Sequence, residues 1–514
     1  MDSTSVFLTL VILLVSVYVT WVYLSNRGLP PSPAVSLPVV GHLLAMNPKD
    51  PRSQMQKWRE KLGDIFSSIE KKQWQIIFRN PFSLRLGPTV VIVLNGYDVI
   101  KEAFVKRGDD FSDRPFSYFD WAGDCHGLGI IMSSGPNWKQ QRSVSLSILR
   151  DMGMGRNVLA GTIQEEVAQY LTRLSELDET QDVRLLTNIS VANVICSVLV
   201  GQRFDYDDPT FKRVIELINY NLSAAAGVGP TLLSMYPILH YLPGDIFNTD
   251  IILKNIKEIG ELFVHYFKDL KGRKEYSETN MDSFIANYVF EKNKQDKSGQ
   301  ATYLDEKNLA KVIEDLLVAG VETTSTTINW FLLYIQHYPQ VQKKIFVEIN
   351  TEIGTERTPT MQDRSKLKYL NAAIMETQRI GNITPMGLPH MCSRDTSFRG
   401  FRIPKGANII GNMTSIFFDK TIWGEDVDTF RPERFIDEMG NLRHLEEFIP
   451  FSLGRRACLG EALAKMELFL YLSSMCQRFQ CLAPNPDAPP KITDVMGVTR
   501  KPGPFQVKVV DRRL

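Results

Sequence analysis

The chain has 514 residues and a formal net charge of +1, and its residues are 44% hydrophobic and 23% charged. These proportions are ordinary for a folded globular protein and exclude a disordered chain. The small net charge argues against nucleic-acid binding through a basic surface. The length suffices for one large domain or two lobes.

The N-terminal segment is strongly apolar. Residues 6–24 carry no charged side chain, and a bilayer core is crossed by roughly 20 such residues. We therefore expect a membrane anchor over residues 1–26. A cleaved signal peptide is the alternative, but Asp2 replaces the basic residues that usually precede its apolar region. Arg27 follows the span, so the positive-inside rule places the body in the cytosol.

A proline-rich stretch over residues 27–42 predicts a stiff hinge, because clustered prolines favour extended backbone. The remaining residues, 43–514, form the predicted body of the protein. The six cysteines include no C-x-x-C pair, which fits a reducing compartment rather than a disulfide framework.

Local patterns predict a mainly α body with small sheets. A β-branched run over 83–95 predicts two short strands, and a helix should begin at Tyr97. Apolar residues at helical spacing dominate from 138 to 350, including one long helix over about 308–338. Glycines and a proline over 396–410 predict a further antiparallel piece.

Cys458 lies between glycines and arginines. Gly454 permits a turn with positive φ, and Gly460 leaves room for a flat ligand against the backbone. An amphipathic helix follows, so the thiol should precede a helix N-terminus. Free N–H groups there should lower the thiol pKa and favour the thiolate that binds metals. We expect the other five cysteines to be inert.

The segment from Phe451 to Gly460, F-S-L-G-R-R-A-C-L-G, resembles the haem-binding loop of the cytochrome P-450 family, F-x-x-G-x-R-x-C-x-G. In that family a cysteine thiolate ligates the haem iron. The resemblance implies a triangular helical body, with haem b (iron protoporphyrin IX) between a long central helix and the cysteine loop. It also implies that Cys458 is the axial ligand and that Phe451 packs near it.

The predicted central helix contains A-G-V-E-T-T, beginning at Ala319. Thr323 can donate to the carbonyl of Ala319 and open the helix locally. By its residues alone, this segment is more readily explained as a buried helix with satisfied threonines than as a ligand site. It resembles the oxygen-binding groove of the same family. The resemblance implies that Ala319 lies against the haem and that Glu322 and Thr323 relay protons to dioxygen.

Glu376 and Arg379 share one helix face, and alone such a pair is usually an exposed ion pair. The later segment F-R-P-E-R-F supplies Arg434. Their order ahead of the cysteine loop resembles the family's pattern. It implies that the three side chains form a buried structural network that holds the haem loop.

Several basic positions resemble the family's contacts to the haem propionates. The segment W-K-Q-Q-R implies contacts from Trp138 and Arg142, and further matches are Arg114, His390 and Arg456. Arginine suits carboxylates because its planar fork can donate two parallel hydrogen bonds. By itself, His390 would be an ordinary surface or core histidine.

One departure from the family pattern is the segment 67–82, which falls where a first strand should run. It is either an external loop or an artefact of the gene model, and we expect it to be dispensable. The substrate pocket should be lined by 117–132, 219–235, Ala319 with Thr323, and 383–388. These segments are apolar, aromatic and small, which favours a lipophilic ligand.

The combined resemblance implies a membrane-anchored haem-thiolate monooxygenase of the microsomal branch. It would act on a fatty acid, a steroid or a foreign compound, using O2 and electrons from an NADPH-dependent flavoprotein reductase, with cytochrome b5 as an optional donor. Lys139, Arg455 and Lys465 could dock the reductase. We expect a monomer, bound to the endoplasmic reticulum membrane, without a nucleic-acid partner. The alternatives are a haem-thiolate isomerase or dehydratase, which Glu322 and Thr323 disfavour, and a non-catalytic haem sensor.

Overall fold

The structure is a computed structural model that describes residues 3–33, 37, 41–42, 45, 47, 54–59, 82–86, 89–154, 157–177, 180–273, 282–299 and 301–513. Its longer α-helices are α1 (Ser3–Asn26), α6 (Gly135–Asp151), α7 (Asn157–Ser175), α8 (Arg184–Val200), α9 (Pro209–Ala224), α10 (Val228–Met235), α11 (Asp250–Arg273), α12 (Phe284–Ser298), α13 (Glu306–His337), α14 (Pro339–Glu352), α15 (Lys368–Gly381) and α18 (Glu461–Arg478).

Shorter helical segments connect these elements: α4 (Tyr97–Lys101), η2 (Glu102–Lys106), α5 (Tyr118–Ala122), η3 (Pro237–Tyr241), η4 (Met361–Asp363), α16 (Thr414–Phe417), α17 (Lys420–Trp423), η5 (Pro432–Phe435) and η6 (Gly454–Arg456). The strands are β1 (Phe82–Leu86), β2 (Thr89–Asn95), β3 (His390–Met391), β4 (Thr396–Phe398), β5 (Phe401–Ile403), β6 (Asn408–Asn412), β7 (Phe479–Leu482), β8 (Asp494–Met496), β9 (Arg500–Pro502) and β10 (Lys508–Asp511).

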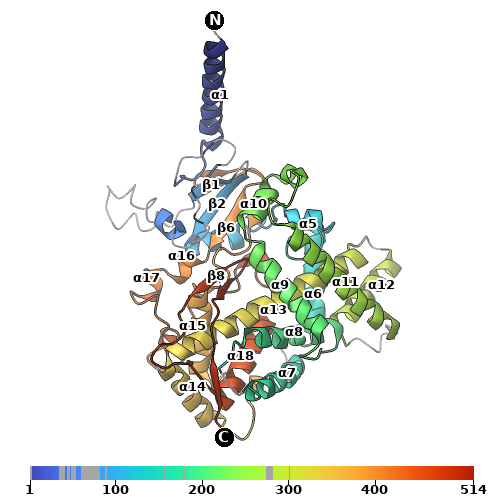
Figure 1. Cartoon of the computed structure of the whole chain (residues 1–514), viewed down its shortest axis with the longest axis vertical. Helices are drawn as coiled ribbons and strands as arrows, with labels where there is room; N and C mark the ends of the chain where they lie inside the picture. Colours follow the sequence, from blue (N-terminus) through green and yellow to red (C-terminus); the bar gives the residue numbers. More distant parts are fainter. Residues whose placement is uncertain are drawn as a thin grey trace.

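The N-terminal helix α1 projects from the body at the end opposite the C-terminus (Figure 1). It includes residues 6–24, over which the sequence predicts a membrane span. In the part of the chain that the structure describes, no α-helix has both the length and the hydropathy of a membrane span.

The largest sheet has the strand order β1-β2-β6-β3. The two strands predicted over 83–95 are confirmed as the antiparallel pair β1–β2, and α4 begins at Tyr97 as predicted. The predicted insert 67–82 lies outside the described residues, except for Phe82, which pairs with Val93 in this sheet.

The prediction for 396–410 is correct only in its first part. The strands β4 and β5 form the expected antiparallel pair, but β6 joins the main sheet parallel to β2. In that register Ile92 lies opposite Ile409, and both side chains are buried. The larger sheet therefore removes apolar side chains from water that an isolated hairpin would leave exposed.

The helix α13 runs through the middle of the helical body (Figure 1). Its bounds match the predicted helix within two residues at the start and one at the end, and the Asp305 side chain caps it by accepting from the Asn308 N–H at 2.7 Å. At Gly320 a Cβ atom would come within 2.6 Å of Ile195 on α8. The glycine therefore permits a close approach of the two helices. Helix α13 stays continuous through the segment that Thr323 was expected to open locally.

Candidate functional site

The cysteine loop packs against the backbone of η2. Gly454 has φ +75°, and a Cβ atom there would lie 2.0 Å from the carbonyl oxygen of Phe104. Both its conformation and the close contact therefore require glycine. Within the loop, the Cys458 N–H donates to the Phe451 carbonyl at 2.9 Å. These contacts fix the cysteine three residues before α18.

The Cys458 side chain is exposed, yet the surrounding protein desolvates it and raises the pKa of its thiol. The expected lowering of the pKa by the helix N-terminus is therefore wrong for the free thiol. The N–H of Gly460 and the charge of Arg142 do favour the thiolate, but desolvation outweighs them.

Helix α6 carries Trp138 and Arg142 one turn apart. The Arg142 guanidinium donates to the carbonyl oxygen of Ala457 at 2.6 Å, which brings it beside the cysteine. The indole Nε1–H of Trp138 is buried and has no hydrogen-bond acceptor among the described residues. Buried donors are normally satisfied, so this indole requires an acceptor that the described protein does not supply.

Arg456 is buried in the same region. Its guanidinium lies 3.8 Å from the centre of the Trp138 ring and donates to the carbonyl oxygens of Ser112, Ile130 and Ser133. Burial, together with the neighbouring arginine charges, lowers the pKa of Arg456 to about 8.

Arg114 is buried too and donates to the carbonyl oxygens of Ile131, Leu388 and Pro389. Desolvation and the charge of Arg142 lower its pKa to about 10.

His390 stacks on the Phe104 ring at 4.1 Å. Its Nδ1 lies 2.6 Å from the carbonyl oxygen of Phe111, and a carbonyl only accepts, so Nδ1 carries the hydrogen. Burial and the charges of Arg114 and Arg456 lower the pKa of His390 to about 3. The ring is therefore neutral.

Arg114, Arg142 and Arg456 form a cluster of positive charge, which we call the cation cluster. The charge of Arg142 lowers the pKa of Arg114, and the charges of Arg114 and Arg142 lower the pKa of Arg456. None forms an ion pair with a carboxylate of the described residues, although the charge of Asp113 acts on Arg456 from a longer distance. Buried charges are normally paired, so the cluster fits an anionic ligand.

A haem, whose two propionates are carboxylates, fits these residues. The cation cluster and the unsatisfied indole of Trp138 offer donors that would suit carboxylates, and Cys458 offers a thiol that would suit the iron. A Cβ atom at Gly460 would have no atom within 4 Å, although its φ of −89° would allow any residue. The space beside this glycine is consistent with a flat ligand.

Helix α13 presents two neighbouring polar side chains in different directions. The Thr323 hydroxyl donates to the Ala319 carbonyl at 2.9 Å, as predicted, and both residues keep some exposure. Glu322 is buried: its Oε1 accepts from Thr499 at 2.7 Å and pairs with Lys501 at 2.8 Å. The Glu322 carboxylate is thus held by β9 and the preceding turn, and the expected proton relay through Glu322 and Thr323 stays a prediction.

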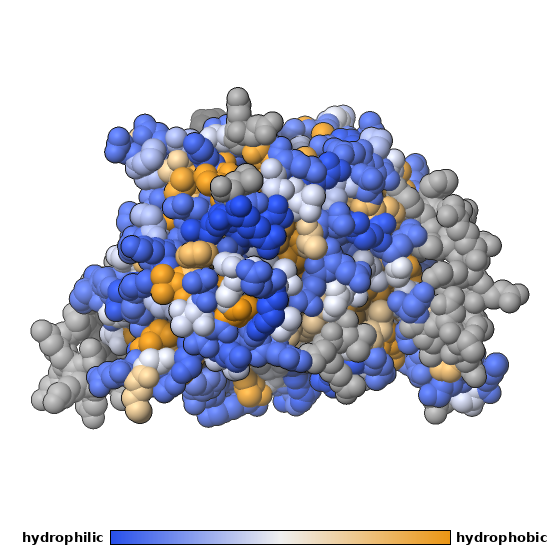
Figure 2. Space-filling model, turned by 90° about the horizontal axis from the view of Figure 1, so that it is seen from below, coloured by the Kyte–Doolittle hydropathy of each residue, from blue (hydrophilic) through white to orange (hydrophobic). Residues whose placement is uncertain are grey.

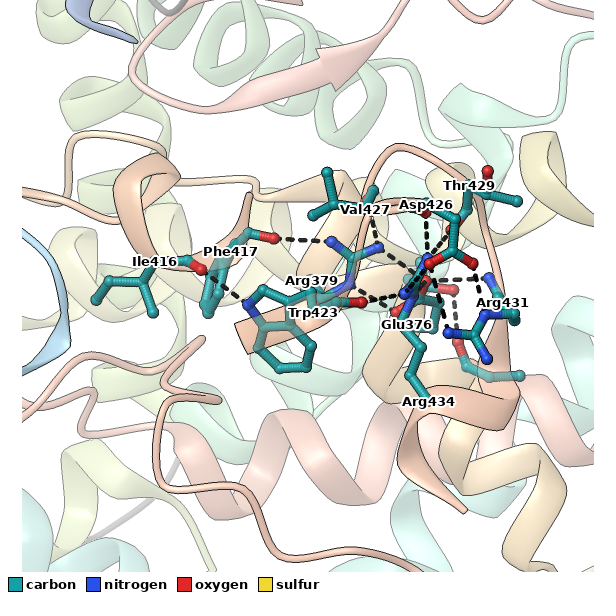
Figure 3. A network of polar contacts seen from close by, with 12 residues as sticks. Glu376, Arg379, Ile416, Phe417, Trp423, Asp426, Val427, Thr429, Arg431 and Arg434 are labelled. Carbon is teal, nitrogen blue, oxygen red and sulfur yellow. Dashed lines mark hydrogen bonds and ion pairs between the residues drawn. The ribbon is translucent and has the colours of Figure 1, made fainter. Parts of the chain in front are cut away.

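Glu376, Arg379 and Arg434 meet in one buried network (Figure 3). Arg379 donates to both carboxylate oxygens of Glu376, at 2.7 and 2.8 Å, and Arg434 donates to Oε1 at 3.2 Å. The Phe435 ring, next to Arg434, packs edge-on against Phe448 at 5.0 Å. The network thus supports the segment that leads into the cysteine loop.

Two of the three residues predicted to dock a reductase already have surface partners. Arg455 pairs with Asp109 at 2.6 Å, and Lys465 pairs with Glu461 at 2.6 Å and lies over the Phe451 ring. Lys139 is exposed on α6.

Sequence reasoning missed the backbone carbonyls that hold the arginines and the partners of Glu322. The carbonyls leave no sequence signal, because every residue has one. Lys501 follows an arginine in a polar stretch, and nothing in that local sequence predicts that it pairs with Glu322.

Comparisons with known proteins agree with this geometry. The family model described as "Cytochrome P450" matches residues 30–509. The chain belongs to the cytochrome P-450 family. It is 35% identical to cytochrome P-450 2U1 of Bos taurus over 526 aligned positions, covering 100% of this chain and 95% of the relative. It is 36% identical to cytochrome P-450 2C3 of Oryctolagus cuniculus over 462 positions, covering 89% of each.

A further relative is cytochrome P-450 2D3 of Rattus norvegicus, 34% identical over 483 positions that cover 93% of this chain and 92% of the relative. The predicted family and microsomal branch are confirmed. As a member of this family the protein is a monooxygenase that binds haem.

Proposed function

We propose that this cytochrome P-450 inserts one oxygen atom of O2 into a lipophilic small molecule, with electrons from NADPH delivered by a flavoprotein reductase. The observation that carries the proposal is the cation cluster beside Cys458, together with the unsatisfied indole of Trp138. Three guanidiniums and one indole donor without a carboxylate partner among the described residues suit a dianionic ligand. The Cys458 thiol, beside Arg142, suits its iron.

The proposal gives each side chain a stated task. Cys458 binds the iron of haem b, and Phe451 holds the loop through its backbone contact. Arg114, Trp138, Arg142, His390 and Arg456 bind the propionates. When bound, the haem supplies the activation of dioxygen and the transfer of an oxygen atom to carbon.

Thr323 and Ala319 line the haem side of α13 in this proposal. The Thr323 hydroxyl is held in place by its bond to the Ala319 carbonyl, so it can hold a proton at Oγ1. We assign Glu322 a positioning task, since its carboxylate joins α13 to Thr499 and Lys501.

Contacts among the predicted pocket walls support a lipophilic substrate. The Tyr118 N–H donates to the Ser234 hydroxyl at 3.4 Å, which joins 117–132 to 219–235. The β8–β9 segment joins 219–235 to the further wall 383–388, because the Val498 N–H donates to the Leu222 carbonyl and the Arg500 N–H donates to the Ile383 carbonyl. Exposed aromatic side chains on these walls or next to them are Phe116, Trp121 and Tyr220.

We propose attachment to the endoplasmic reticulum membrane through the N-terminal segment, with the catalytic body in the cytosol. Apolar side chains of α1 are exposed, among them Phe7, Ile12 and Leu14. The face seen from the end opposite α1 is mainly hydrophilic, with small scattered apolar patches (Figure 2). Deleting residues 1–26 should release the protein from sedimented membranes, and retention at the wild-type level would refute this attachment.

The reaction is tested first by the spectrum of the reduced protein with carbon monoxide. We expect the strongly red-shifted Soret band of thiolate ligation, its loss in Cys458→Ser and its retention in the control Cys125→Ser. Absence of the band from the wild-type protein would refute the proposal. Reductase and lipophilic candidates are then added, and substrate-dependent NADPH consumption is expected. Product formation without NADPH would favour the isomerase alternative.

A further inference from the structure

The loop between α5 and α6 connects the central helix to the cation cluster. We call residues 127–133 the bridging loop. On its α13 side, the N–H groups of Ile130 and Ile131 both donate to Oδ2 of Asp315, at 2.7 and 2.9 Å. One residue earlier, the Gly129 N–H donates to the Asn308 side chain at 3.2 Å.

The carbonyls of the same residues point to the arginines. The Ile130 carbonyl accepts from Arg456 at 3.2 Å, and the Ile131 carbonyl accepts from Arg114 at 3.0 Å. Consecutive residues therefore donate to one aspartate and accept from two guanidiniums. Hydrogen bonds arranged in such a chain polarise and strengthen one another.

We propose that Asp315 is a positioning residue for haem binding: it fixes the bridging loop so that Arg114 and Arg456 face the propionates. The proposal rests on the haem-binding function proposed above. It assigns Asp315 no contact with the haem itself.

The geometry at Gly129 shows how closely the loop is fitted to this carboxylate. Gly129 has φ +74°, and a Cβ atom there would lie 2.5 Å from Oδ2 of Asp315. The loop can approach the aspartate only with glycine at this position. Asp315 is only 5% exposed, so its oxygens depend on protein donors rather than on water.

A competing explanation is that Asp315 serves only as a counter-ion. Lys311 lies 3.4 Å from its other oxygen, Oδ1, and also pairs with Glu314 at 3.2 Å and Asp120 at 3.6 Å. Each explanation involves a different carboxylate oxygen of Asp315: Oδ2 accepts hydrogen bonds from the bridging loop, and Oδ1 lies near Lys311. Asparagine can keep an oxygen at the loop position while it loses the charge.

The test measures haem loss from the purified full-length holoprotein to excess apomyoglobin, followed by absorbance. We expect Asp315→Ala to lose haem roughly tenfold faster than wild type or more, since two hydrogen bonds to a charged group are removed. Asp315→Asn should stay within about twofold of wild type. The matched control is Glu314→Gln, which changes a neighbouring carboxylate that contacts Lys311 and should also leave the rate unchanged.

A double variant tests whether Asp315 acts through the arginines. If it does, Asp315→Ala should add little to the haem loss of Arg456→Met, because coupled residues are not additive. Full additivity would overturn the proposal, as would wild-type haem loss in Asp315→Ala or equally fast loss in Asp315→Asn. If Asp315→Ala yields no folded protein, Asp315→Ser, whose side chain is too short to reach both N–H groups, takes its place with the same outcomes.

Failure of the proposed function gives a different result. In that case the wild-type protein itself lacks the red-shifted carbon monoxide band. If Asp315 has no positioning role, the wild-type band is present and the variants retain haem equally.

Discussion

Two groups of buried arginines differ in what surrounds their charge. Arg379 and Arg434 share the carboxylate of Glu376, so their charge is balanced within the protein. Arg114 and Arg456 donate to backbone carbonyls instead and form no ion pair with a carboxylate of the described residues. Desolvation by burial, together with the charges of neighbouring arginines, lowers their pKa values. The charge of the first group is balanced without a ligand, whereas the second group keeps positive charge that an anionic ligand can balance.

The comparison indicates which buried charges support the fold and which bind an anionic ligand. A paired buried ion that loses its partner is strongly destabilising. An unpaired buried cation costs free energy in the folded protein until an anion binds. Substitutions should therefore act on the free energy of unfolding in one group and on haem retention in the other.

The largest expected effect is in the paired group. Arg379→Ala leaves the Glu376 carboxylate buried with fewer donors and should lower the free energy of unfolding by about 3–5 kcal/mol. Urea unfolding of the holoprotein, followed by circular dichroism, measures it. The control is Lys420→Ala, which breaks an exposed pair with Glu425 and should leave the free energy of unfolding nearly unchanged. Equal free energies of unfolding for the two variants would show that the buried pair with Glu376 does not stabilise the fold more than an exposed pair does.

Glu467 extends the comparison because it is a buried carboxyl that forms no ion pair with a cation of the described residues. Its Oε2 accepts from Thr324 at 2.9 Å, its Oε1 has no partner among the described residues, and desolvation raises its pKa to about 8. Between about pH 4.5, the ordinary pKa of a glutamate carboxyl, and about pH 8, the folded protein therefore keeps a proton on Glu467 that the unfolded chain has released. Stability from this group is present below pH 4.5 and is lost as the pH rises through about 8.

Glu467→Gln should remove that pH dependence and keep an acceptor for Thr324. From pH 5.5 to 7.5, the wild type should lose about 1.4 kcal/mol per pH unit relative to the variant. Urea unfolding at the two pH values checks this. Parallel pH profiles of the two proteins would show that the carboxyl is ionised in the fold.

In the unpaired group, Arg456→Met should speed haem loss roughly tenfold, the factor that about 1.4 kcal/mol produces. The circular dichroism spectrum should stay that of the wild type, because no carboxylate is left without its partner. Arg455→Met is the matched control, since the neighbouring side chain pairs with Asp109 at the surface. If Arg456→Met unfolds without losing haem faster, Arg456 supports the fold rather than binding haem.

The smallest effect is expected for Trp138→Phe. Phenylalanine keeps an aromatic ring under the Arg456 guanidinium but lacks the Nε1–H, which has no acceptor among the described residues. One hydrogen bond to the ligand is lost, so haem loss should rise only a few-fold, about 1 kcal/mol or less. The free energy of unfolding should not fall. Haem transfer and urea unfolding measure the two quantities, and haem loss at the wild-type rate would exclude Nε1 as a propionate donor.

Several parts of the fold and of the site followed from local sequence. The strands β1 and β2, the start of α4 and the span of α13 were predictable because each depends on spacing and punctuation among neighbouring residues. The pairing of β6 with β2 was not, since parallel partners far apart in the chain leave no local signal. The direction of the Cys458 pKa shift was also missed, because desolvation depends on every segment around the thiol.

The sequence by itself determined the family and the residues that could bind haem, because the cysteine loop and the arginine motifs are short patterns of residue type. Only the tertiary structure decided which charges are balanced. Glu322 and Lys501 lie far apart in the chain yet pair at 2.8 Å, and Asp315 meets the arginines only through two peptide groups. Partners and burial belong to the packed chain, because they depend on which distant segments come together.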